Sequence, residues 1–159
     1  MLDAFLEDYQ DAVLIPATVE TECVRDVAAP GAVVIRERIR SRRIKVRRLR
    51  REAAIKKLMA DFRLGRGEAE ALFLAQTSKA NLMASDDRQA IRACKALGIP
   101  FTTALAFLLR AAEKRLLAPA DIQASLGRLV DIGRYKAAIV EDAKRKLREI
   151  SDEQKTKDA

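Results

Sequence analysis

The chain has 159 residues, 49% of them hydrophobic and 34% charged, with only six glycines and four prolines. This is the composition of a folded domain with a sizeable core, and it excludes disordered, collagen-like and low-complexity classes. The sequence contains no histidine, which excludes Ser-His-Asp and Cys-His nucleophiles and nearly all zinc chemistry. Any catalysis must therefore use carboxylates, lysines or hydroxyls.

Apolar spacing and helix breakers predict helices that alternate with short strands along the chain. The predicted strands are 12–15, which Pro16 ends, then 44–49, 81–84 and 99–103. The predicted helices are 2–10, 32–42, 53–62, 68–76, 88–97, 104–117, 119–130 and 134–150. One more predicted helix, between 2–10 and 32–42, is capped by Thr18 and carries Val19, Cys23 and Val27 on one face. We expect a single α/β domain, 1–150, with a mainly parallel sheet, and a polar, frayed or disordered tail, 151–159.

The net charge of +8 is concentrated in one stretch, 36–51, which contains ten Lys and Arg against one acid, Glu37. Such a cluster fits a phosphate backbone or an acidic partner, and the alternative is a solvated Arg-rich surface. The candidate nucleic-acid-binding residues are Arg40, Arg42, Arg43, Lys45, Arg47 and Arg48. No aromatic residue falls inside the cluster, which argues against a platform for stacking single-stranded bases.

The expected compartment follows from the absence of a signal-peptide pattern, a disulfide framework and a membrane-spanning run in the sequence. Its first residues include Asp3, Glu7 and Asp8, which is unlike a signal peptide. The two cysteines, Cys23 and Cys94, are too few and too far apart for a disulfide framework. The longest apolar runs, such as 104–109, are far shorter than a membrane span. We expect a cytoplasmic protein with no membrane partner.

Acidic residues lie close to the carboxyl ends of two predicted strands, where α/β proteins form their sites. Asp86 and Asp87 follow the strand 81–84, Glu68 opens the helix that leads into it, and Glu22 lies one turn into the helix after the first strand. Carboxylates grouped without histidine suggest a Mg²⁺ or Mn²⁺ site, because hard cations prefer oxygen ligands.

Each of these acids also has a purely structural interpretation. Ser85-Asp86-Asp87 fits a helix N-cap, and Gly67-Glu68-Ala69-Glu70 fits a helix start with acids in its first turn. Glu22 fits the polar flank of the apolar stripe in its helix. Taken singly, each acid is more simply explained by structure than by chemistry.

Several segments, in order along 2–150, together resemble a prokaryotic PIN-domain family of predicted nucleic-acid-binding, toxin-like proteins. The matching segments are the strand, Pro and helix of 13–22 with Glu22 at the acidic position, the helix start Gly67-Glu68-Ala69-Glu70-Ala71, the turn Asp86-Asp87-Arg88 and the strand Leu97-Gly98-Ile99-Pro100. In the Gly-Thr pair that follows in the family, Thr103 matches and Thr102 departs.

The resemblance implies a three-layer α/β/α sandwich and a Mg²⁺- or Mn²⁺-dependent ribonuclease that acts on RNA. It further implies a toxin held by a cognate antitoxin, in a family where homodimers are common. Carried over to this sequence, Glu22, Glu68 and Asp86 match the catalytic and metal-binding acids, Asp87 is an adjacent candidate ligand, and Thr103 matches a hydroxyl at the site edge.

One departure from the family pattern concerns the opening strand, which in PIN domains ends in a metal-binding Asp. Here Met1-Leu2-Asp3 matches the helix that follows that strand, and Asp3, Asp8 and Asp11 are not preceded by a buried strand. We expect either that the start of translation lies upstream or that this is a degenerate or recombined copy. Three hypotheses follow: a metal-dependent ribonuclease, a non-catalytic PIN-like module that binds RNA or an antitoxin, and an α/β fragment without activity.

Overall fold

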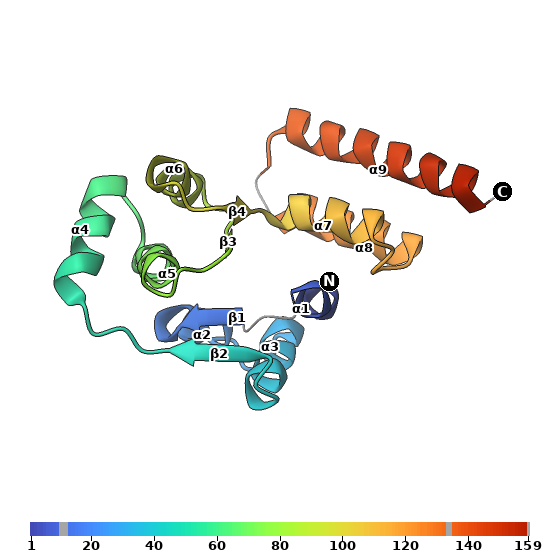
Figure 1. The fold of residues 1–159 in the computed structure, drawn as a ribbon. Helices are drawn as coiled ribbons and strands as arrows, with labels where there is room; N and C mark the ends of the chain where they lie inside the picture. Colours follow the sequence, from blue (N-terminus) through green and yellow to red (C-terminus); the bar gives the residue numbers. More distant parts are fainter. Residues whose placement is uncertain (10–12, 133–134, 159) are drawn as a thin grey trace. The chain divides into compact units, whose positions relative to one another are not determined.

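A computed structural model of the protein describes residues 1–9, 13–132 and 135–158 (Figure 1). The helices are α1 (Leu2–Asp8), α2 (Ala17–Cys23), α3 (Pro30–Arg40), α4 (Glu52–Phe62), α5 (Arg66–Thr77), α6 (Arg88–Leu97), α7 (Ala104–Glu113), α8 (Pro119–Ile132) and α9 (Ala137–Asp158). The strands are β1 (Val13–Pro16), β2 (Ile44–Arg47), β3 (Met83–Ala84) and β4 (Phe101–Thr102). The predicted order of helices and strands is confirmed along these described residues.

The chain divides into two compact units, each considered by itself below. The strand unit is Tyr9–Thr102 and contains all four strands with α2 to α6. The helical unit is Met1–Asp8 together with Thr103–Ala159, and it contains α1, α7, α8 and α9.

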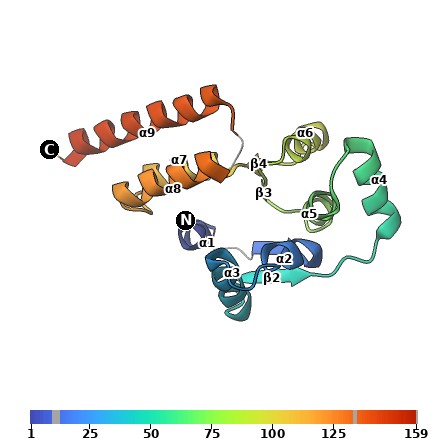
Figure 2. The same ribbon diagram turned by 180° about the vertical axis from the view of Figure 1, so that it is seen from behind.

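The strands of the strand unit form two parallel pairs, as the predicted parallel sheet requires. β1 pairs with β2 in a register that places Val13 beside Ile44 and Pro16 beside Arg47. β3 pairs with β4, with Met83 beside Phe101. Both pairs can be followed from the two sides of the molecule in Figures 1 and 2, and α5 contacts β1 as well as β3. Parallel strands need long crossover connections, and the helices between them supply these.

Element boundaries near the first strand differ from the sequence expectation. Pro16 ends β1 as its last paired residue and serves as the N-cap of α2 with extended backbone, so Thr18 lies inside the helix rather than capping it. α2 then ends at Cys23, so Val27 is not part of its apolar stripe and is 64% exposed. The next helix begins at Pro30 because proline is favourable in the first turn, where its missing N–H has no helical partner.

The core of the strand unit lies among α4, α5 and α6. Ile55, Leu72, Ala90, Ala93 and Cys94 are fully buried there. Alanines at the contact allow the helices to approach closely, and the Cys94 thiol lies 3.5 Å from the Met83 sulfur at the start of β3. This packing sets where α5 begins relative to the strands, and so it positions the acids discussed below.

The helical unit is joined by ring packing and by an ion cluster. Phe5 of α1 meets Phe107 of α7 edge to face, with ring centroids 4.9 Å apart. Hydrogen bonds from Lys114 and Arg110 hold the pKa of the Asp8 carboxyl, whose side chain is only 3% exposed, below its ordinary value. α9 continues to Asp158, so the tail from 151 that the sequence predicts to be frayed is helical as far as the description reaches. The predicted start of this helix at Arg134 falls outside the described residues.

Two further features concern the cysteines and the apolar character of the helices. Cys23 is an exposed free thiol and Cys94 a buried one. Among the described helices, none has both the length and the apolar character that crossing a membrane requires.

Candidate functional site

The first turn of α5 is where acids from separate segments meet. α4 ends at Phe62, and Arg63 adopts a left-handed backbone conformation (φ 54°) that turns the chain away from the helix. Gly65 is the N-cap of α5 and has extended backbone, and Glu68 lies in the first turn. The break that the sequence predicts at Leu64–Gly67 is therefore the start of α5 itself, with its free N–H groups and positive dipole end.

Glu22 reaches this helix start from α2. A Cβ atom placed on Gly67 would lie 3.0 Å from Glu22 Oε2 and 3.3 Å from Glu22 Oε1. The same position would lie 3.4 Å from a methyl carbon of Val19, one turn earlier in α2. Gly67 is buried and lacks a side chain, and this lets α2 bring the Glu22 carboxylate against the backbone of α5.

Glu68 lies at the same helix start, and its carboxylate approaches the other glycine, Gly65. Its side chain folds back so far that Oε2 occupies the space where a Cβ of Gly65 would be. Glu68 is the third residue of α5, a position from which a glutamate side chain can fold back to the N-cap residue. Glu22 and Glu68, 46 positions apart in the sequence, therefore lie at the same end of α5, where its dipole favours negative charge.

Arg66, between the two glycines, holds this helix start against α4. Its guanidinium donates to both carboxylate oxygens of Glu52 at 3.0 and 2.8 Å, and to Glu70 at 2.9 Å. Glu70 is 5% exposed, so Arg66 supplies the charge partner that a buried carboxylate needs. The hydrogen bonds from Arg66 also lower the pKa of Glu52 below its ordinary value.

Asp86 and Asp87 follow β3, as the sequence predicts. Asp87 is the N-cap of α6, and its Oδ1 accepts from the backbone N–H groups of Gln89 and Ala90, both at 2.8 Å. Ser85 Oγ accepts from the N–H of Asp87 at 3.2 Å. The structural interpretation of this segment as a cap thus holds for Asp87, while Asp86 is an exposed residue beside it.

The remaining candidates are distributed more widely. Among the described residues, the structure groups no three acids or cysteines closely enough to hold a metal ion, so Asp86 does not form such a group with Glu22 and Glu68. Thr103 belongs to the helical unit, where it caps α7 by accepting from the N–H of Ala106 at 3.1 Å.

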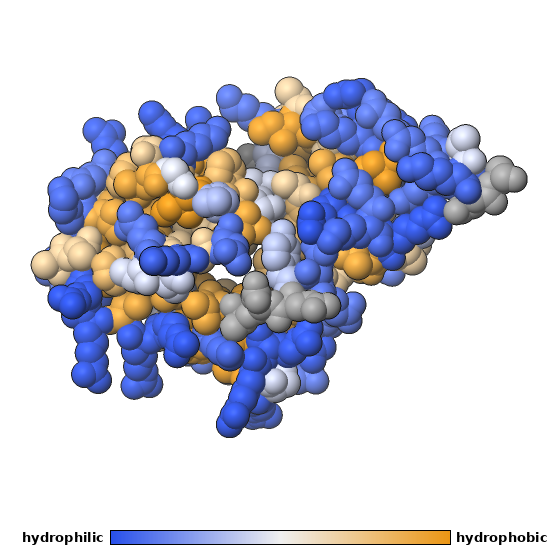
Figure 3. Space-filling view, in the orientation of Figure 1, coloured by the Kyte–Doolittle hydropathy of each residue, from blue (hydrophilic) through white to orange (hydrophobic). Residues whose placement is uncertain are grey.

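The basic candidates lie at the end of α3, in the following turn, along β2 and just after it. All are exposed: Arg40, Arg42, Arg43, Lys45, Arg47 and Arg48, which together we term the basic surface. Ile44 of β2 is buried and Val46 half-buried, so the strand alternates as predicted, with Lys45 and Arg47 on its polar side. In Figure 3, hydrophilic side chains extend from the lower edge, where Figure 1 places β2 and α3.

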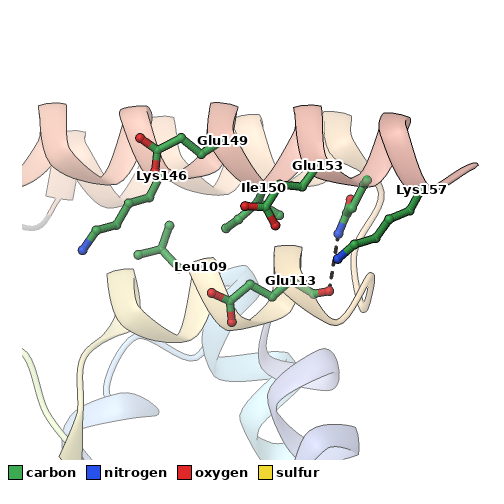
Figure 4. Close-up of a pocket in the computed structure, with 8 residues that line it drawn as sticks. Leu109, Glu113, Lys146, Glu149, Ile150, Glu153 and Lys157 are labelled. Carbon is green, nitrogen blue, oxygen red and sulfur yellow. Dashed lines mark hydrogen bonds between the residues drawn. The ribbon is translucent and has the colours of Figure 1, made fainter.

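A pocket of 510 Å³ lies in the helical unit between α7 and α9 (Figure 4). Leu109 and Ile150 form its apolar part, and Gln154 Nε2 bridges the helices by donating to the carbonyl oxygens of Ala112 at 2.8 Å and Glu113 at 3.4 Å. The other lining residues are Lys146, Glu149, Glu153 and Lys157. No residue predicted for catalysis or nucleic-acid binding lines it.

Sequence reasoning missed the two glycines and the arginine between them. The sequence pattern predicts an interruption between helices at Gly65 and a helix start at Gly67, but it does not predict that another segment approaches either glycine, and it gives Arg66 no role. The available signal was a pair of glycines immediately before acids in a predicted first turn, a pattern that allows close approach of another segment.

Parallel strands joined by helices, with two carboxylates at a helix N-terminus in the strand unit, define an α/β protein. A sequence model described as PIN domain matches residues 2–149. The chain therefore belongs to the PIN-domain family, and its α/β/α fold with short parallel strands is that of a nuclease-type module. Neither the curated proteins nor the solved structures contain a match to it.

Proposed function

We propose that this protein is a divalent-metal-dependent ribonuclease that uses Glu22, Glu68 and Asp86. The observation that carries the proposal is that the carboxylates of Glu22 and Glu68 both lie at the first turn of α5, one against Gly67 and the other against Gly65. Membership of the PIN-domain family supports nuclease chemistry at such a site.

The donors at this helix start suit a hard divalent cation. Carboxylate oxygens are the ligands that Mg²⁺ and Mn²⁺ prefer, and Gly67 keeps clear the space that a Cβ would take from the Glu22 carboxylate. Glu22 and Glu68 would hold the ion, whereas Asp86 and the adjacent Asp87 are proposed as ligands on the family resemblance alone, because the structure does not group them with these two acids. The bound ion would supply an activated water and stabilise the leaving oxygen in phosphodiester hydrolysis.

The protein's own residues prepare the site in two ways. Arg66 pairs with Glu52 and Glu70, which fixes the start of α5 and so the backbone against which both carboxylates lie. The basic surface would attract the RNA backbone and raise its local concentration near the strand unit.

The test is RNA cleavage by the full chain in Mn²⁺, using a fluorescent RNA pool of random sequence. Glu22→Gln, Glu68→Gln and Asp86→Asn should each abolish cleavage while leaving the thermal unfolding midpoint within a few degrees. Glu20→Gln removes another carboxylate of α2 and should retain activity, which makes it the matched control. Cleavage that persists in all three site variants would overturn the proposal.

A second candidate is a non-catalytic PIN-like module that binds RNA or an antitoxin through the basic surface. Two observations favour it: no three acids group closely among the described residues, and Asp87 is engaged as a helix cap. It predicts salt-sensitive association without turnover in Mn²⁺. In either form, the resemblance suggests the toxin of a toxin–antitoxin pair, with an acidic antitoxin segment covering the basic surface.

A further inference from the structure

The basic surface brings together, within a few residues of one another in the sequence, exposed cations that have no carboxylate partner among the described residues. Lys56 and Lys57 of α4 pair with Glu52 and Asp61. In contrast, five cations of the basic surface form no ion pair or side-chain hydrogen bond with any described residue: Arg40, Arg42, Lys45, Arg47 and Arg48. Five exposed positive charges are thus available to phosphates.

This surface also has no aromatic ring on which a base could stack. Every Phe and Tyr of the chain lies outside 36–51. Proteins that grip single strands combine a positive groove with aromatic side chains, each stack contributing about 1–3 kcal/mol. Arginine and lysine side chains that contact only phosphates do not recognise the bases. Binding to this surface therefore depends on how densely the ligand presents phosphates.

Phosphate density separates duplexes from single strands. Neutralising one phosphate releases about 0.9 counterions from a duplex and about 0.7 from a single strand. For five contacts at 0.05 M salt, this difference corresponds to about 20-fold tighter binding of the duplex. We propose that the basic surface is a docking site for double-stranded RNA, held by its phosphates and not by its bases.

The basic surface lies close in the fold to the helix that carries Glu22. The inference that bound RNA reaches the proposed acids rests on the proposed function. Arg47 pairs in register with Pro16, so the carboxyl ends of β2 and β1 lie at the same edge. α2 begins at the next residue, Ala17, and carries Glu22. A duplex that lies along β2 therefore reaches the edge from which the helix of Glu22 starts.

Fluorescence anisotropy with the full chain in EDTA tests the docking site without cleavage. The probes are a 20-base-pair RNA duplex and a single-stranded 20-mer of uridine, each titrated between 0.05 and 0.25 M salt. We expect about 20-fold tighter binding of the duplex at the lowest salt, with log K falling at a slope of about −4.5 against log salt. Equal or tighter binding of the single strand, or binding of neither probe, would overturn the inference.

Two double variants that each remove two charges locate the contact. Lys45→Gln/Arg47→Gln should reduce the magnitude of the salt slope by about 2, whereas Lys56→Gln/Lys57→Gln on α4 should leave it unchanged. Equal loss in both would show that net charge, and not this surface, attracts RNA. Since EDTA is present throughout, failure here leaves the metal site to be judged by Mn²⁺-dependent cleavage, so the two proposals fail separately.

Discussion

Replacing Gly67 by alanine tests whether Glu22 is a metal ligand without removing any carboxylate. The added Cβ would lie 3.0 Å from Glu22 Oε2, whereas ordinary contacts of a Cβ begin at 3.4 Å. The carboxylate must therefore move by about 0.4 Å, more than the roughly 0.2 Å within which metal–ligand distances are held. We expect the affinity for Mn²⁺ to fall about tenfold or more, as it does when the support of a ligand is disturbed.

The same substitution should not weaken the fold, which separates the two effects. Alanine is preferred to glycine inside a helix by about 1 kcal/mol, and at Gly67, in the first turn of α5, this preference opposes the cost of the close contact, so Gly67→Ala should leave the free energy of unfolding near that of the unaltered protein. Gly127→Ala is the matched control, because Gly127 also lies inside a helix, α8, and a Cβ there would meet nothing within 4 Å. It should gain the same helix preference and leave Mn²⁺ binding unaltered.

The assay is isothermal titration of Mn²⁺ into each full-length variant, with urea unfolding measured in parallel. If Gly67→Ala bound Mn²⁺ as tightly as the unaltered protein, the Glu22 carboxylate would not be a ligand at this helix start. An equal loss of affinity in Gly127→Ala would refute the reasoning in another way, because it would show that the change does not act through Glu22.

Four further variants test the packing and charges within each of the two units. Arg66→Ala should lower the free energy of unfolding by about 1–3 kcal/mol in urea, because it leaves the buried Glu70 carboxylate unpaired, and Arg66→Ala/Glu70→Gln should recover part of that loss. The pKa of Asp8 is held below its ordinary value of about 3.8 by Lys114 above all, so its contribution to stability is complete above that pH and is lost as the pH falls through the lower, folded-state value. Urea midpoints between pH 2.5 and 6 should show this loss, and Asp8→Asn should flatten it; a slope unchanged by Asp8→Asn would contradict the assignment. Leu72→Ala should cost about 2–5 kcal/mol because Leu72 is fully buried, and a cost under 1 kcal/mol would contradict the packing of α5.

The helices and strands could be predicted because their signals are local. Apolar periodicity, the acid cap at Asp87 and the left-handed Gly98 at the end of α6 all act within one or two turns. Errors arose where two local signals competed, as at Pro16, which was expected only to stop a strand and which also begins the following helix.

The candidate site was less accessible to sequence reasoning than the elements that carry it. The resemblance to PIN domains selected Glu22, Glu68 and Asp86 and included Gly67 in a helix start, but it gave Gly65 and Gly67 no part in bringing segments together and gave Arg66 no role. Whether Asp87 serves as a cap or a ligand also could not be decided from spacing, because a helix N-cap and a metal-binding turn use the same residue types.

Composition, periodicity and motif order by themselves determined the α/β class, the order of elements, the basic cluster and the family. Only the tertiary structure decided that the Glu22 carboxylate lies against Gly67. It also decided that Arg66 pairs with both Glu52 and the buried Glu70. In the same way, it placed Arg47 beside Pro16 at the carboxyl ends of the paired strands. The physical reason is range: a helix or turn is stabilised by neighbours in the sequence, whereas the meeting of distant segments depends on how whole helices pack. That packing is set by many weak contacts spread along the chain, and no single motif encodes it.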